Sequence, residues 1–169
     1  RYKTSLYIDG EVSSGILNGN VYLKGSGDPT LQYNELLNFA KALKNEGIKE
    51  INGSLYGDES AFIGAQLTPG IAAEDESYYY AARTTGLILS PDDDFDAGTI
   101  IVEVTGEVEG EKPTLLVKPN AMGMTIVNNA STVNKENQNT LSIKRKYRTD
   151  EVMITGNIPV KKKKKEWVT

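Results

Sequence analysis

The chain has 169 residues, with 19 basic and 23 acidic side chains, a net charge of −4, and neither cysteine nor histidine. This length suits one domain of ordinary size or two small ones. The missing residue types exclude disulfides, thiolate chemistry, serine-histidine-acid triads and histidine-based metal sites within these residues.

The distribution of charge argues against nucleic acid as a partner. Five basic residues form one run, Lys161 to Lys165, and the remainder of the chain stands at 14 − 23 = −9. Such a surface repels phosphate backbones. The run itself is typical of a solvated tail or of an edge strand, where lysines discourage edge-to-edge pairing. Attraction to anionic polymers and plain solubility both fit it.

No apolar stretch approaches the length of a transmembrane helix. The chain starts at Arg1 without a signal-like segment or an initiator methionine. We therefore expect a fragment, or a mature chain whose targeting information lay elsewhere.

The first 24 residues alternate apolar and polar side chains, which is typical of short strands. Asp9-Gly10 and Asn18-Gly19 are hairpin-turn pairs because both residues of such a pair tolerate positive φ. The pattern predicts an antiparallel meander.

The stretch YLKGSGDPTL, residues 22–31, follows these strands. A glycine-rich turn before a helix can bind phosphate, but here the Asp28 carboxylate occupies the place of an anion. We therefore predict a structural turn, in which Gly25 and Gly27 permit positive φ and Asp28 accepts backbone N–H groups.

One amphipathic helix is predicted over residues 34–46, with Asn34 as its N-cap and Gly47 closing it in a left-handed conformation. Residues 50–56 alternate again and predict a strand. Residues 57–83 are irregular.

From residue 85 onward, short strands and turns alternate without helices, which is typical of a small sandwich or barrel. The predicted strands cover residues 86–89, 99–105, 114–118, 124–128, 140–146, 151–155 and 165–168. The fold class is thus α+β: a small antiparallel sheet with one main helix, followed by an all-β sandwich or barrel-like second domain. The composition changes near residues 90–98, so we expect domains at 1–97 and 98–169.

Residues 92–103 resemble a calcium loop. Asp92, Asp94, Asp96 and Glu103 occupy its positions one, three, five and twelve. Position six should be glycine but is Ala97, and the flanks alternate like strands. The pattern therefore favours an acidic, solvated turn, and no metal or cofactor is expected.

Serine chemistry can proceed without histidine when a lysine follows the serine by three residues. No serine in this chain has such a lysine, none begins a Ser-x-Asn, and no Lys-Thr-Gly occurs. We expect no catalytic residue here.

The stretch EDESYYYAARTTGL, residues 74–87, combines acids with three adjacent tyrosines. Three consecutive rings on an extended backbone cannot all point inward. An exposed ring beside Glu74 and Asp75 suits a ligand with an amine and an aliphatic stem, although ordinary core tyrosines also fit the pattern.

Several phrases together resemble one family. They are LYIDGEVSSGILNGNVYLKGSGDPTL, ELLNFAKALKNEGIKEINGSLYGDES, EDESYYYAARTTGLILSPDDDFDAGTIIVEV and EVMITGNIPVKKKKKEWV. They are similar to the D-alanyl-D-alanine carboxypeptidase/endopeptidase family, the low-molecular-mass class C penicillin-binding proteins. In that family an extracytoplasmic serine-lysine acyl-transfer domain, which trims peptidoglycan stem peptides, carries a long two-domain insertion. The resemblance implies that this chain is the insertion, with its catalytic serine outside these residues.

The resemblance also implies a substrate-binding role. An aspartate and an aromatic residue five places later hold the amine-bearing side chain of the stem peptide in the family, and the matching residues here are Asp75 and Tyr80. Ala73 stands where the family often carries tryptophan, so Glu74 or Tyr78 could share the work.

Two interpretations follow. In the first, the chain is a non-catalytic accessory region of a cell-envelope carboxypeptidase, and its partners are the stem peptide and the catalytic domain of the same polypeptide. In the second, it is an independent extracellular binding module for calcium or a cell-wall polymer.

Overall fold

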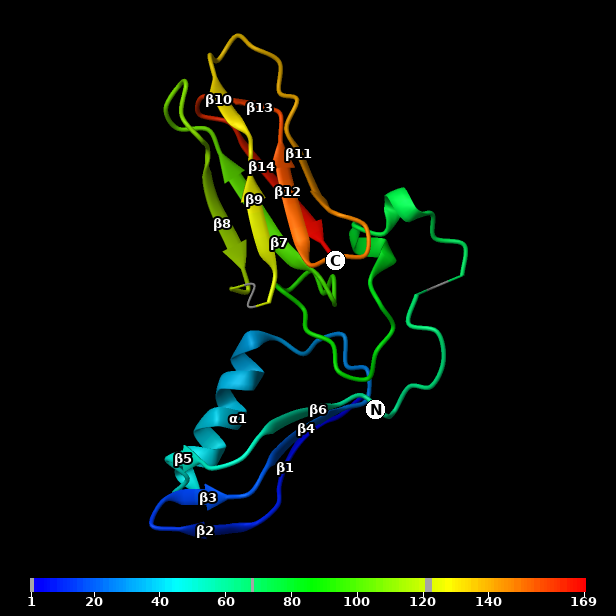
Figure 1. Cartoon of the computed structure of the whole chain (residues 1–169), viewed down its shortest axis with the longest axis vertical. Helices are drawn as coiled ribbons and strands as arrows, with labels where there is room; N and C mark the ends of the chain where they lie inside the picture. Colours follow the sequence, from blue (N-terminus) through cyan, green and yellow to red (C-terminus); the bar gives the residue numbers. More distant parts are fainter. Residues whose placement is uncertain (1, 68, 121–122) are drawn as a thin grey trace. The chain divides into compact units, whose positions relative to one another are not determined.

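The computed structural model describes residues 2–67, 69–120 and 123–169. The chain divides into two compact units (Figure 1). Unit 1 contains residues 1–66 and 83–97, and unit 2 contains residues 67–82 and 98–169. The predicted domain boundary at residue 97 remains a prediction, and residues 67–82, which the sequence places in the first domain, group here with unit 2.

Unit 1 consists of six strands and one helix in the described residues. They are β1 (Thr4–Ile8), β2 (Glu11–Ser13), β3 (Ile16–Asn18), β4 (Val21–Gly25), α1 (Tyr33–Asn45), β5 (Glu50–Ile51) and β6 (Leu55–Asp58). Two three-stranded sheets form, in the orders β1-β4-β6 and β2-β3-β5. A small core of Leu17, Val21 and Ile48 joins them, with Leu6 and Leu43 packed against it.

The strand pairing in unit 1 is only partly antiparallel. β1 pairs with β4 and β2 with β3 in antiparallel fashion. The predicted meander, in which consecutive strands pair, does not form, because β1 pairs with β4. β4 with β6 and β3 with β5 are parallel pairs, so the expectation of a purely antiparallel sheet is wrong. The reason is that α1 carries the chain back to the start of the sheet, which makes the next strand parallel to its neighbour.

The predicted hairpin turns at Asp9-Gly10 and Asn18-Gly19 are also wrong. The chain reverses at Ser14-Gly15, where φ is 51° and 84°. Asp9-Gly10 and Asn18-Gly19 instead lie opposite each other, at the point where the chain of β1–β2 and that of β3–β4 pass from one sheet into the other. A Cβ on Gly19 would lie 2.0 Å from the Asp9 carbonyl oxygen, and one on Gly53 would lie 2.0 Å from the Gly19 carbonyl oxygen. Glycine is therefore required there for close backbone approach rather than for a turn.

The turn at residues 25–30 has the predicted structural form. The Asp28 carboxylate accepts the backbone N–H of Thr30 at 2.9 Å, and Gly27 adopts φ of +77°. Gly25 is needed for space rather than positive φ, because a Cβ there would lie 2.1 Å from the Gly86 carbonyl oxygen.

The helix starts one residue before the predicted Asn34, and Gln32 is its N-cap. The Glu35 carboxylate accepts the backbone N–H of Gln32 at 3.1 Å, which is half of a capping box. At the other end the prediction is confirmed: Gly47 has φ of +84°, and the N–H of Ile48 donates to the Leu43 carbonyl at 3.0 Å.

Unit 2 is almost entirely β structure. Its strands are β7 (Ile100–Thr105), β8 (Thr114–Lys118), β9 (Thr125–Asn128), β10 (Ser131–Val133), β11 (Ser142–Arg145), β12 (Glu151–Thr155), β13 (Asn157–Pro159) and β14 (Lys163–Val168). The sheet orders are β14-β7-β8, β11-β12-β9 and β10-β13. One core, drawn from β7, β11, β12, β13 and β14, lies between them.

The α+β class with one main helix is confirmed, and the described strands of unit 2 close no barrel. The predicted strand at residues 86–89 does not form, and β10 and β13 were not predicted. The lysine run ends in β14, an edge strand as expected. There Lys163 pairs with Glu103 at 2.9 Å, and the Lys164 ammonium donates to the Leu141 carbonyl at 2.8 Å.

Within the described part of the chain, none of the helices has the length and apolar character to cross a bilayer.

The bend in unit 1 generates a stability prediction. Gly19→Ala places a methyl group against backbone that cannot rotate away, so we expect the free energy of unfolding to fall by about 1–3 kcal/mol. The matched control is Gly57→Ala in β6, whose new Cβ would meet only the Leu87 Cδ2 methyl at 3.2 Å. That variant should stay within about 0.5 kcal/mol of the parent. Urea denaturation followed by circular dichroism measures both, and equal midpoints for the two variants would contradict the constraint.

Candidate functional site

The four predicted site residues lie on one short segment, residues 72–82, which we call the strap. It contains two single-turn 3₁₀ helices, η1 (Ala73–Asp75) and η2 (Tyr79–Ala81). Successive backbone bonds shape it: Asp75 donates to the Ala72 carbonyl at 3.0 Å, and Tyr78 to the Asp75 carbonyl at 3.0 Å. These turns place acidic and aromatic side chains from adjacent positions close together.

A buried arginine fastens the strap to the sheets of unit 2. Arg145 of β11 lies 3.7 Å from the Glu76 carboxylate, and the two side chains are only 9% and 7% exposed. The guanidinium also donates to the main-chain carbonyls of Glu76 at 3.2 Å, Thr149 at 3.0 Å and Thr169 at 2.5 Å. Its fork of donors therefore joins the strap, the β11–β12 turn and the residue after β14.

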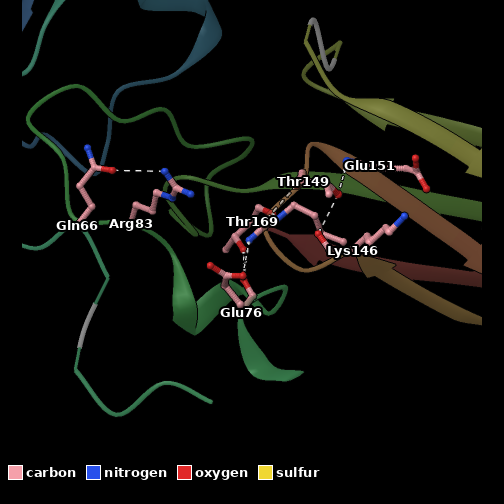
Figure 2. A network of polar contacts seen from close by, with 8 residues as sticks. Gln66, Glu76, Arg83, Lys146, Thr149, Glu151 and Thr169 are labelled. Atoms are coloured by element: carbon pink, nitrogen blue, oxygen red, sulfur yellow. Dashed lines mark hydrogen bonds and ion pairs between the residues drawn. The ribbon is translucent and has the colours of Figure 1, made fainter. Parts of the chain in front are cut away.

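Thr169 completes this anchor (Figure 2). Its hydroxyl donates to the Glu76 carbonyl at 2.6 Å, and its backbone N–H donates to the Ser77 carbonyl at 3.3 Å. Tyr78 forms an isolated antiparallel bridge with Val168 of β14. The strap thus lies along the end of an edge strand, and its own Ala81 side chain is buried.

The tyrosines of the strap form one aromatic cluster. The rings of Tyr78 and Tyr80 stack with centroids 5.6 Å apart and planes 17° apart, while Tyr79 meets Tyr80 edge to face at 5.5 Å. Tyr79 and Tyr80 are both about half exposed, at 54% and 52%. Contact with its neighbours therefore holds Tyr80 in place while one part of its ring stays open to a ligand.

Asp75 and Tyr80, the two residues that the resemblance singles out, lie close together. The pKa of the Tyr80 phenol is raised above its usual value, first by partial burial of the group, then by the negative charge of Asp75 and a hydrogen bond to its carboxylate. The Asp75 side chain is half-buried, next to Glu76 in the anchor. A carboxylate and a half-exposed ring are thus presented side by side.

The other two predicted residues have different surroundings. Glu74 is exposed and makes no hydrogen bond or ion pair with any described residue. Tyr78 is half-buried within the cluster, and the Lys144 ammonium lies 5.3 Å from its ring centroid. Lys144 on β11 was not predicted, because nothing in its local sequence connects it with residues far earlier in the chain.

The arrangement has the chemistry of a cation-binding surface. A carboxylate attracts an ammonium group, and the adjoining tyrosine rings suit an aliphatic stem or a cation. Among residues 2–67, 69–120 and 123–169, no group of three or more acidic side chains is placed as metal ligands. In the calcium-like stretch, Glu103 is instead paired with Lys163, which lowers the pKa of its carboxyl.

Comparisons with known proteins place these observations in a family. The sequence profile of the D-Ala-D-Ala carboxypeptidase 3 (S13) family matches residues 1–169. The chain is 32% identical over 140 residues to a D-alanyl-D-alanine carboxypeptidase of Actinomadura sp. (strain R39), covering 83% of this chain and 26% of that protein. It is 39% identical over 62 residues to D-alanyl-D-alanine carboxypeptidase DacB of Haemophilus influenzae, covering 37% of this chain and 13% of that protein.

A similar fold occurs in a solved structure. The crystal structure of penicillin binding protein 4 (dacB) from Haemophilus influenzae superposes with a TM-score of 0.71 at 18% identity, over 99% of this chain and 36% of that one. The chain therefore spans about a third or less of the relatives that it matches.

The contact between Asp75 and Tyr80 generates a titration prediction. Asp75→Asn removes the negative charge that opposes ionisation of the phenol, so the pKa of Tyr80 should fall toward 10.0 without reaching it, because the partial burial remains. Carbon-13 NMR of labelled tyrosines measures the shift, with Tyr80→Phe assigning the resonance. Asp150→Asn, which removes an exposed carboxylate elsewhere in unit 2, is the control. An unchanged Tyr80 titration in Asp75→Asn would show that the two groups do not interact.

Proposed function

Because this chain belongs to the D-Ala-D-Ala carboxypeptidase 3 (S13) family, we propose that it is an accessory region of a longer serine-type D-Ala-D-Ala carboxypeptidase. In this role it is inserted in the catalytic domain and recognises the side chain of the peptidoglycan stem peptide. The enzyme would act outside the cytoplasm, in the cell envelope, where that substrate is found.

Two observations support an accessory rather than a catalytic role. The family profile covers the whole chain, yet the chain spans only 26% of the Actinomadura relative. The residues also contain no Ser-x-x-Lys, Ser-x-Asn or Lys-Thr-Gly. A serine nucleophile without histidine needs a nearby amine base, so the reacting groups would come from residues outside 1–169.

The observation that carries the recognition role is the pairing of Asp75 with Tyr80 on the anchored strap. The half-exposed Tyr80 ring lies beside the Asp75 carboxylate, whose charge contributes to raising the pKa of the phenol. A stem-peptide side chain that ends in a free amine would place its ammonium at this carboxylate and its methylene groups against the ring. Glu74 adds a second negative charge nearby without being held in one position.

The first test concerns the location of the nucleophile. We expect the full-length protein to be labelled covalently by a fluorescent penicillin, while the isolated 169-residue chain stays unlabelled at the same concentration. The measurement is fluorescence in a denaturing gel, with unlabelled penicillin as competitor. Labelling of the isolated chain, or a reading frame without Ser-x-x-Lys before Arg1, would overturn the proposal and favour an independent binding module.

The second test concerns recognition. In the full-length enzyme, Asp75→Asn should lower kcat/KM about tenfold, or about 1.4 kcal/mol, for stem peptides that end in a free amine, because a charged hydrogen bond is lost. The loss should appear mainly in KM, and peptides with an acetylated amine should be affected much less.

Two further variants make this kinetic test specific. Glu74→Gln should give a smaller loss of the same kind, and Asp150→Asn should give none. Equal losses for charged and acetylated peptides would remove Asp75 from side-chain recognition.

A further inference from the structure

A second feature of the chain, the loop of residues 59–66, has both ends held firmly. The backbone N–H of Phe62 donates to the Glu59 carbonyl at 3.1 Å, and the Gln66 side chain donates to the Glu59 carboxylate at 3.2 Å. The Thr85 hydroxyl donates to the same carboxylate. Gln66 is held in turn by the backbone N–H of Thr84 at 2.7 Å and by the Arg83 guanidinium at 3.3 Å (Figure 2).

This fixed loop has an apolar tip. Ile63 is fully exposed, at 100%, and Phe62 is 44% exposed. Residues 61–65 read Ala-Phe-Ile-Gly-Ala, without a polar side chain. The Phe62 ring lies only 2.6 Å from the place where a Cβ on Gly27 would stand, so the ring rests on the glycine turn and holds the tip outward. A small pocket of about 90 Å³ lies beside the tip, between Phe62, Gln66 and Thr84.

From this geometry we propose that the 59–66 loop docks, through Ile63, on the part of the parent polypeptide that lies outside residues 1–169. The inference rests on the proposed function, since it requires that this chain be part of a longer enzyme. A tip that is apolar, ordered in advance and provided with an adjoining pocket is suited to binding a protein surface, because little further ordering is needed.

The occupant follows from length and charge. The chain covers 36% of the similar penicillin-binding protein structure, so most of such a protein would lie outside it and be available as a partner. Asp58 is paired with Lys24 at 2.9 Å, which leaves Glu59 as the other charged side chain within residues 58–66, and it is acidic. Its charge gives no attraction to an anionic lipid surface, whereas the apolar tip suits an apolar patch on the same polypeptide.

The test uses the full-length protein with Ile63→Cys and, as the control, Val108→Cys, which replaces a residue that is 54% exposed in unit 2. Maleimide labelling rates at each site are read by mass spectrometry and normalised to the rates in denaturing urea. We expect Ile63→Cys to react more than about tenfold more slowly than Val108→Cys.

Three outcomes would overturn the docking proposal: equal normalised rates, protection that appears only with lipid vesicles, or protection that depends on protein concentration and so comes from a second copy. Penicillin labelling of the same variants separates the two proposals. A labelled protein with a reactive Ile63→Cys retains the proposed function but not the docking. A protein that penicillin never labels loses the proposed function whatever its maleimide rates.

Discussion

The strap depends on a single buried guanidinium. Arg145 neutralises Glu76 in a region from which water is largely excluded, and it also donates to three main-chain carbonyls from separate parts of unit 2. Removing one partner of such a pair typically costs about 3–5 kcal/mol, because the other charge stays buried without compensation. The strap itself contributes little apolar burial, chiefly Ala81. Its position is therefore determined by polar contacts more than by packing.

The dependence of the strap on Arg145 explains why it carries two adjacent carboxylates with different surroundings. Glu76 lies next to Asp75 in the chain, and of these two carboxylates it is the one on Glu76 that is paired with Arg145. Arg145 thus anchors the backbone beside Asp75, the proposed recognition residue, without cancelling its charge. A guanidinium paired with Asp75 would compensate the charge that the proposed site offers to a cation.

Local signals predicted local structure well. The closing glycine of α1 and the turn around Asp28 depend on neighbours close in sequence, and both were predicted. The edge position of the lysine-rich strand, one of two alternatives for that run, depends on its pairing with the distant strand β7. The strand pairing depends instead on contacts between distant residues. Gly10, Gly19 and Gly53 are indistinguishable from turn glycines in the sequence, yet they are required by backbone atoms on the facing strand. Gln32 was missed as an N-cap because Asn34 is the better cap by propensity alone.

The candidate site was predictable in part for similar reasons. Asp75 and Tyr80 lie within one short stretch, where the resemblance to a family and the chemistry of acid and ring point to the same residues. Arg145 could not be distinguished from the other basic residues, since its partner Glu76 lies 69 positions earlier in the chain. Lys144, one position before Arg145, reaches the same tyrosine cluster and was missed for the same reason. Absent residue types were the more decisive signal, because the lack of histidine and cysteine excludes thiolate chemistry, histidine triads and histidine-based metal sites within these residues on composition alone.

The balance of charge on the strap limits what it can bind. Glu74 and Asp75 are both negative, Glu76 is compensated by Arg145, and Lys144 brings one positive charge to the ring of Tyr78. The Lys144 ammonium and the ring of Tyr80 both lie within 6 Å of the centre of the Tyr78 ring, at 5.3 and 5.6 Å. A bound ammonium at Asp75 would therefore experience attraction from two carboxylates and repulsion from one amine. Because the Lys144 side chain is exposed and can turn toward water, the proposed site would favour a cationic group over an anionic one.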